Sequence, residues 1–318
     1  MRKFLVKTSI AVFIALVLHL IAGFYAGGKT DAYYLRFTGQ SKRSMIIGTS
    51  RASQGMVPSQ FDPLIQSAGF EGPMYNFAFT SLTSPFGEVY LNKIQQKLDP
   101  SVKNGLFIVT VEPYSICIAP TDSTGRKAKL PELSGALYTT HYANVTPNYE
   151  YLLHNYTNGW GHLFLEHFNL TVNEMDLQHD GWLKVDVAMD SISIAKRAKG
   201  KISNHRKSVG QYVLSPMRVE YLEKTIAYLQ QHGKVFMVRL PVSQPIYDIE
   251  LDILPEFSDV MIRTAEKMNI PYNDMNGAKE LYQYKDGHHI GRESAYLCSD
   301  SVARWMASYT NVIYKTGQ

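Results

Sequence analysis

Short apolar runs alternate with segments of helical periodicity along most of the chain, which indicates an α/β fold. Runs without polar interruption are typical of strands buried on both faces of a parallel sheet. We expect strands at Met45–Ile47, Met74–Phe79, Gly105–Val111, Lys234–Leu240 and Ile270–Asp274, and helices at Pro85–Leu98, Ser215–Gln231, Asp252–Met268 and Gly291–Ser308. This alternation predicts βαβ units, and therefore a mainly parallel sheet with helices on both faces.

The periodic pattern is lost between residues 114 and 214, a stretch rich in tyrosine, asparagine and histidine that holds Trp160 and Trp182. The stretch is too long for an ordinary loop, so we predict an insertion with short helices that lies over the functional edge of the sheet. Its aromatic and polar residues favour either a carbohydrate-stacking surface or a local hydrophobic core.

An uncharged run of 19 residues from Thr8 to Ala26 follows Arg2, Lys3 and Lys7. As a helix it spans about 28 Å, enough for the hydrocarbon core of a bilayer. Basic residues before the run predict that the N-terminus is inside and the rest of the chain outside. We therefore expect a membrane anchor over residues 1–28 and one domain over 29–318. A cleaved signal peptide is the alternative, which the length of the run and the lack of a clean Ala-x-Ala site disfavour.

The overall composition is that of a globular protein, with 45% hydrophobic and 19% charged residues. A net charge of +4 without long Lys/Arg runs argues against a nucleic-acid partner. The basic stretch Lys196–Lys201 is either a solvated face or a contact with anionic lipid headgroups. Cys117 and Cys298 form no metal-type pair, and both a disulfide and two free thiols stay open.

A serine follows the first expected strand directly. Gly48 ends the apolar run and Ser50 stands in a tight turn at the carboxyl end of the strand, where ligands bind in open α/β sheets. N–H donors of the next helix can surround a serine placed there, which makes Ser50 a candidate nucleophile. The alternative is a serine that only caps the helix.

An Asp-x-x-His motif, Asp286 to His289, stands in a glycine-containing loop before the last expected helix. A carboxylate three residues earlier can hold one ring nitrogen of His289, as a general base requires. Exposed histidines in a simple turn are one alternative. A metal site of Asp286, His288 and His289 is another, but it lacks a convincing fourth ligand, so we expect neither metal nor cofactor.

Together, these two motifs resemble the SGNH (GDSL-type) esterase superfamily. Gly48-Thr49-Ser50 stands where the family has Gly-Asp-Ser, and the last block, Asp286 to His289, is intact. The resemblance implies a flavodoxin-like three-layer α/β/α sandwich and a catalytic triad of Ser50, His289 and Asp286.

The resemblance also implies an oxyanion hole, formed by the backbone N–H of Ser50 and by Asn76 after the second expected strand. No Gly-x-Asn-Asp block follows the third strand, where Val111-Glu112-Pro113 stands instead. We consider four further residues as substrate contacts: Arg51, Arg239, Trp160 and His288. For Arg51 and Arg239, pairing with a carboxylate is the alternative.

The anchor, the altered first block and the insertion are similar to the membrane-anchored, extracytoplasmic branch of bacterial SGNH proteins. That branch includes the D-alanyl transfer protein of teichoic acid synthesis and the alginate-type O-acetyltransferases. The resemblance implies a periplasmic domain on the cytoplasmic membrane, an MBOAT-type membrane acyltransferase as partner, and O-acylation, most often acetylation, of a cell-envelope polysaccharide through an acyl-Ser50 intermediate. An envelope carbohydrate esterase or deacetylase and a non-catalytic glycan-binding or scaffold protein are the alternatives.

Overall fold

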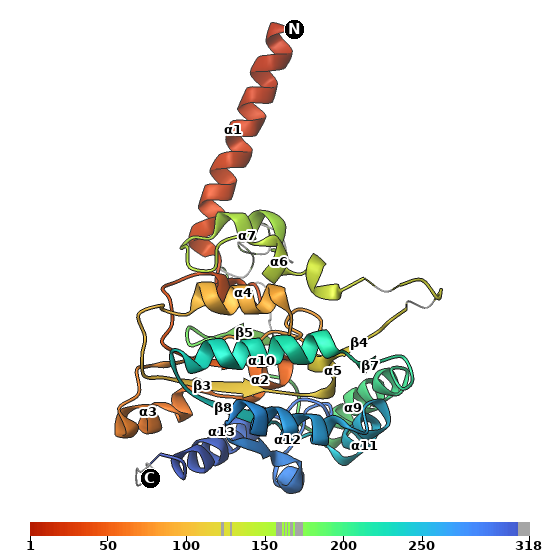
Figure 1. Cartoon of the computed structure of the whole chain (residues 1–318). Coiled ribbons are helices and arrows are strands. Elements are labelled where there is room, and N and C mark those ends of the chain that lie inside the picture. The colour runs from red at the N-terminus through yellow and green to blue at the C-terminus, as the bar shows by residue number, and fades with distance from the viewer. Residues whose placement is uncertain are drawn as a thin grey trace.

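A sheet of five parallel strands forms the centre of the domain (Figure 1). The computed structural model describes residues 1–310 apart from 122, 123, 128, 157–160, 162, 164, 166, 167 and 169–173. The strand order β2-β1-β3-β8-β9 is the flavodoxin-like order of doubly wound sheets, which confirms the predicted fold class. The strands are β1 (Ser44–Ile47), β2 (Met74–Asn76), β3 (Gly105–Thr110), β8 (Gly233–Arg239) and β9 (Tyr272–Asp274).

Strands β1, β2 and β3 are buried throughout and β8 is buried over most of its length, whereas the edge strand β9 is only partly buried. Successive side chains point to opposite sides of the sheet. Met45 and Ile47 of β1 join one hydrophobic cluster, whereas Ile46 between them joins the other. The first cluster is covered by helices α4 (Glu88–Lys97), α10 (Pro216–Gln230), α11 (Gln244–Ile253) and α12 (Phe257–Met268). The second is covered by α2 (Ser50–Gly55), the 3₁₀ helix η2 (Pro58–Gln60), α3 (Asp62–Ala68), the 3₁₀ helix η4 (Met275–Leu281) and α13 (Arg292–Ala307).

The expected single helix Asp252–Met268 is wrong, because the structure has two helices there, α11 and α12. Pro255 lies between them. A proline disfavours helical backbone in the residue before it, and Leu254 indeed leaves the helix with φ −146° and ψ 80°. Helix α11 supplies Glu250, which is fully buried and pairs with Arg51 of α2.

The region between β3 and α10 is closed at its base by a two-stranded antiparallel ribbon of β4 (Cys117–Ile118) and β7 (Val213–Leu214). The ribbon brings the two ends of the inserted segment together. The described elements between β3 and β7, besides β4, are α5 (Pro113–Ile116), the 3₁₀ helix η3 (Pro131–Ser134), α6 (Ala136–Thr139), α7 (Tyr149–His154), the hairpin β5 (Met175–Leu177) and β6 (Leu183–Val185), and α9 (Ser191–Arg206).

The basic stretch belongs to α9, which packs on α11. In Figure 1, α9 lies away from the base of the N-terminal helix. Lys196 and Lys199 are exposed there, whereas Lys201 is half-buried beside the candidate site.

The N-terminal helix α1 (Arg2–Tyr25) projects from the domain (Figure 1). It is the one helix among the described residues that is long and apolar enough to cross a membrane, and its most apolar window has a mean hydropathy of 2.3. Length and composition fit a membrane anchor or a signal sequence equally. The 3₁₀ helix η1 (Tyr34–Phe37) then leads into the domain, where Arg36 is fully buried and donates to the carbonyls of Asn76 and Gly181.

Both cysteines are buried free thiols. Cys117 belongs to the cluster on one face of the sheet, and Cys298 belongs to the cluster on the other. Because the sheet separates them, they form no disulfide.

Candidate active site

Ser50 is the first residue of α2, directly after the turn that follows β1. Gly48 has φ 153°, and a Cβ there would collide with the side chain of Thr110 on the neighbouring strand β3. The turn therefore needs glycine, and it places Ser50 between the carboxyl ends of β1 and β3. The strand order reverses at this point, which is where open α/β sheets bind ligands.

The loop before α13 holds the second half of the site. Gly287 adopts the left-handed conformation (φ 81°), and its carbonyl accepts a hydrogen bond from the backbone N–H of Ser243. One carboxylate oxygen of Asp286 accepts from the backbone N–H groups of His288 at 3.0 Å and His289 at 2.7 Å. The carboxylate thus stabilises the loop and keeps its other oxygen for the side chain of His289.

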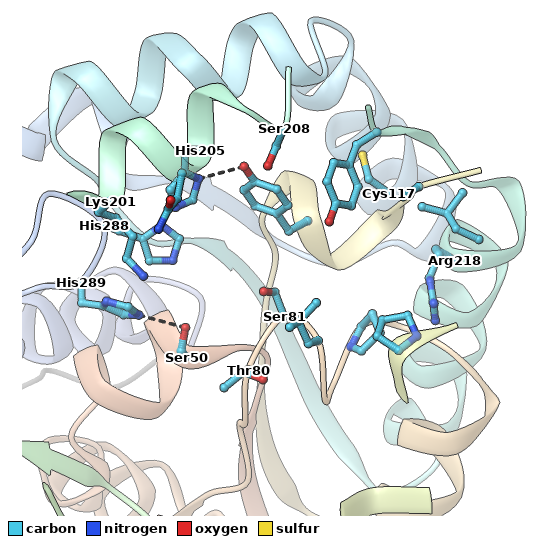
Figure 2. A pocket seen from close by; sticks show the side chains of 18 of the residues that line it. Ser50, Thr80, Ser81, Cys117, Lys201, His205, Ser208, Arg218, His288 and His289 are labelled. Atoms are coloured by element: carbon cyan, nitrogen blue, oxygen red, sulfur yellow. Dashed lines mark hydrogen bonds between the residues drawn. The ribbon is translucent and has the colours of Figure 1, made fainter. Parts of the chain in front are cut away.

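The structure brings Ser50, His289 and Asp286 into one hydrogen-bonded chain (Figure 2). The Ser50 Oγ lies 2.9 Å from His289 Nε2, and His289 Nδ1 lies 2.8 Å from Asp286 Oδ2. These distances are those of a nucleophile, a general base and the carboxylate that orients the base. The arrangement joins residues 239 positions apart in the chain.

Protonation favours the same assignment of roles. Burial disfavours the charged form of Asp286, but the hydrogen bond and charge of His289 outweigh burial and hold the Asp286 pKa well below its usual range. Burial lowers the pKa of His289, and Asp286 only partly opposes this shift. At neutral pH the pair is therefore an ionised carboxylate and a neutral imidazole that can accept a proton.

A buried network of charges lies behind the triad. Thr49, between Gly48 and Ser50, donates its hydroxyl hydrogen to Glu112 after β3. Glu112 is also ion-paired with Arg51 Nε at 2.6 Å, and Arg51 reaches on to Glu250 of α11. Burial raises the pKa of Glu112 even though Arg51 opposes the shift, whereas the pKa of Glu250 is lowered because two arginines outweigh its burial.

Three histidine rings lie in a row beside this network, His205 tilted against His288 and His288 edge-on to His289. Arg51 lies 3.2 Å from His288 Nδ1, and because a guanidinium only donates, Nδ1 accepts. The ring of His288 lies 4.5 Å from that of His289 and 4.7 Å from that of His205, centroid to centroid. Burial, reinforced by Arg51, lowers the pKa of His205 to about 4 and that of His288 well below its ordinary value. Both rings are therefore neutral, and His288 packs against His289 without competing for the proton of Ser50.

A pocket of about 680 Å³ opens from the triad (Figure 2). One wall comes from the loop after β2, which contributes Thr80 and Ser81 to the pocket that Ser50 also lines (Figure 2). The opposite wall comes from α5, α9 and the turn after α9. It carries hydroxyl, amide, imidazole and ammonium groups from Tyr114, Lys201, Asn204, His205 and Ser208. Arg218 of α10 lies at the far end. Sequence reasoning missed these residues, because they come from four segments that only the fold brings together.

Asn76 does not fit the oxyanion role predicted for it. Its side-chain amide donates to the carbonyls of Ala52 at 2.8 Å and Met56 at 2.9 Å, and its oxygen accepts from the N–H of Ala78. Both amide hydrogens are thus used to fix α2 and the residue after it, and Asn76 is absent from the pocket lining.

Two of the four predicted substrate contacts, Arg51 and Arg239, are placed away from the pocket lining. Both are nearly fully buried and pair with Glu250, and Arg239 also contacts Asp274 at 3.1 Å. Both arginines are therefore paired with carboxylates, which is the alternative to a substrate contact. His288 does line the pocket, and Trp160 lies outside the described residues.

Among the residues that the structure describes, no group of three or more His, Cys, Asp or Glu side chains is placed to hold a metal ion. Asp286 and His289 face each other through the hydrogen bond of the triad.

No family model and no curated protein matches the chain. Among solved structures, the chain is similar to a lipase/acylhydrolase from Enterococcus faecalis with a TM-score of 0.38 and 12% identity, covering 86% of this chain and 100% of the other. It is also similar to the native M. smegmatis aryl esterase (TM-score 0.36, 11% identity, 84% and 99% covered). A third is Est24, a carbohydrate acetylesterase from Sinorhizobium meliloti (TM-score 0.34, 10% identity, 84% and 100% covered). By name these three proteins act on acyl groups or esters, but likenesses this remote carry no conclusion about the activity of the present chain.

Proposed function

We propose that the chain is a serine-dependent acyl-transfer enzyme that acts outside the cytoplasmic membrane and moves an acyl group, such as acetyl, onto a hydroxyl of a cell-envelope polysaccharide. The observation that carries the proposal is the hydrogen-bonded chain Ser50–His289–Asp286 at 2.9 and 2.8 Å. A non-catalytic glycan-binding or scaffold protein has no need of this complete arrangement in a pocket.

In the first half-reaction, Ser50 Oγ attacks the carbonyl carbon of an acyl ester and its proton passes to His289 Nε2. The bond between that carbon and the leaving oxygen then breaks, and His289 returns the proton to the leaving oxygen. The product is an acyl ester on Ser50, while Asp286 stabilises the imidazolium that forms in between.

In the second half-reaction, a hydroxyl gives its proton to His289 Nε2 while its oxygen attacks the acyl carbon. The bond between that carbon and Ser50 Oγ then breaks, and His289 returns the proton to Ser50 Oγ. A sugar hydroxyl makes the enzyme a transferase, and water makes it an esterase. The polar wall from Tyr114 to Ser208 supports a hydroxyl-rich acceptor, because such surfaces hydrogen-bond sugars. The pocket volume lies within the range of small-molecule sites.

The negative charge on the carbonyl oxygen needs donors other than Asn76. We assign this role to the backbone N–H of Ser50 and to the loop segment Thr80–Ser81, which lines the same pocket as Ser50 (Figure 2). Helix α1 supports a location at the membrane, where a membrane acyltransferase of the MBOAT type would supply the acyl group.

The transferase is distinguished from the esterase by the fate of the acyl group. With 4-nitrophenyl acetate as donor, we expect acetylated sugar to form when an oligosaccharide such as cello-oligosaccharide or chito-oligosaccharide is added, and Ser50→Ala to form none. Mass spectrometry of the oligosaccharides measures this product. If free acetate is the sole product with every acceptor tested, the enzyme is an esterase and the proposed transfer to a sugar is wrong.

The activity is expected to fall at acid pH, with a midpoint below the ordinary histidine value of 6.5. His289 accepts the proton only when neutral, and burial favours its neutral form, so the active form persists to lower pH than for a free histidine. The pH profile of kcat/KM for 4-nitrophenyl acetate measures this midpoint. An acid limb centred clearly above 6.5 would contradict the proposed base.

A further inference from the structure

An apolar surface lies on the side of the domain from which α1 emerges. Helices α6 and α7 bury Leu137 and Leu152 in the core, so side chains exposed on these helices and their connection point away from it. Figure 1 places both helices next to the base of α1. We call the exposed group the anchor-side face: Tyr138, Tyr142, Val145 and Leu153, with exposed fractions of 56%, 65%, 47% and 64%.

Helix α7 packs directly against the last turns of α1. The Tyr149 hydroxyl donates to the Leu20 carbonyl at 3.3 Å, and the Tyr149 ring lies 5.4 Å from that of His19. Gly23 permits this approach, because a Cβ there would lie 2.6 Å from the Tyr149 ring and 3.0 Å from Pro147. Leu20 lies about 8 Å along the helix axis before its last residue, so the contact is inside the apolar run and not beyond it.

Buried side chains fix the connection between α6 and α7 by hydrogen bonds to its backbone carbonyls. Lys93 and Lys97 of α4 donate to the carbonyls of His141 and Ala143, each at 3.0 Å. Asn148 donates to the carbonyl of Tyr142 at 2.7 Å. The anchor-side face is therefore a preformed surface and not a set of side chains on a loose loop.

We propose that the anchor-side face lies in the headgroup layer of the bilayer that α1 crosses, as a second point of membrane contact. If α1 crosses the bilayer, its apolar run ends at Ala26, about 9 Å along the helix beyond Leu20. Helix α7, which contacts α1 at Leu20 and Gly23, then lies beside the last part of this run, at the edge of the hydrocarbon core and next to the headgroups. Tyrosine suits this layer, because its ring is apolar and its hydroxyl is polar. The continuity of the face with α1 identifies the occupant as lipid.

The same contact fixes the pocket relative to the membrane. Pro131 lines the pocket and begins η3, which continues through Gly135 into α6. A wall of the pocket and the anchor-side face thus belong to one short stretch of chain. Membrane docking would hold the pocket at a defined height above the bilayer, independently of the chemistry at Ser50.

Fluorescence quenching in nanodiscs that contain no other protein tests this proposal on the full chain. An NBD label on Tyr142→Cys or Leu153→Cys is expected to be quenched several-fold more by brominated lipid than a label on Ile192→Cys. Ile192 is 81% exposed on α9, away from the base of α1, and the native Cys117 and Cys298 are buried. Val12→Cys in α1 serves as the label inside the bilayer.

Quenching at positions 142 and 153 no stronger than at 192 would overturn the proposal. It would mean that the anchor-side face is exposed to water or is the binding surface of another protein. Lack of quenching at position 12 would overturn it as well, since the proposal requires α1 to enter the bilayer. Neither result depends on catalytic activity, so the proposal and the proposed function fail independently.

Discussion

Replacing Ser50 with alanine is expected to lower kcat for 4-nitrophenyl acetate by at least about 10³-fold. The change removes the oxygen that lies 2.9 Å from His289 Nε2 and leaves the pocket walls in place. We therefore expect turnover to be lost while the thermal unfolding midpoint stays close to that of the wild type. Initial rates and a thermal melt of the same preparation measure both quantities.

Ser67→Ala is the matched control, because it removes one hydroxyl from α3, where Ser67 Oγ donates only to the nearby Leu64 carbonyl at 3.2 Å. This variant should keep wild-type turnover. A Ser50→Ala enzyme that retains turnover within about tenfold of the wild type would exclude a covalent serine mechanism and would leave water activation by His289 or a non-catalytic role.

Replacing Arg51 with methionine is expected to lower the free energy of unfolding by about 3–5 kcal/mol. Arg51 is paired with Glu112 and Glu250, and all three side chains are almost completely buried. Methionine fills a similar volume but leaves two carboxylates buried without this cation, and it removes the donor to His288 Nδ1. Denaturant unfolding in mild detergent measures the loss.

Two further variants separate the buried network from a general effect of losing an arginine. Arg43→Met removes an arginine whose side chain is 50% exposed and paired with Glu71 and Asp99, so we expect a loss below about 1 kcal/mol. Adding Glu112→Gln to Arg51→Met should recover part of the stability, because it neutralises the carboxylate that loses its ion pair, whereas Glu250 keeps its pair with Arg239. Equal losses for Arg43→Met and Arg51→Met would contradict the structural role of the network.

The parts of the site that the sequence predicts are those with a local signal. The run Met45–Ile47 before Gly48 identifies the first strand and the turn that presents Ser50, and the spacing of Asp286 and His289 is a one-turn relation within a single loop. The parallel sheet follows from the alternation of buried runs and helices, whereas its flavodoxin-like order is implied only by the resemblance of the two motifs.

Asn76 shows where local reasoning fails. Its position after β2 is visible in the sequence, but the direction of its side chain depends on the carbonyls of Ala52 and Met56, which only the folded turn of α2 presents. In the same way, Arg51 gives no sign in the sequence that its partners are Glu112 and Glu250. Glu112 follows β3, and Glu250 belongs to α11, a helix that the sequence pattern does not predict as separate from α12.

The most direct test of the catalytic account is the mass of the Ser50 peptide after brief reaction with 4-nitrophenyl acetate and acid quenching. We expect the wild-type peptide that contains Ser50 to gain the mass of one acetyl group. In the Asp286→Asn variant, which disturbs the base but keeps the serine, the same peptide should gain this mass more slowly. An unmodified Ser50 peptide during rapid turnover, or an acetyl group found on another side chain at the same rate as turnover, would contradict the account.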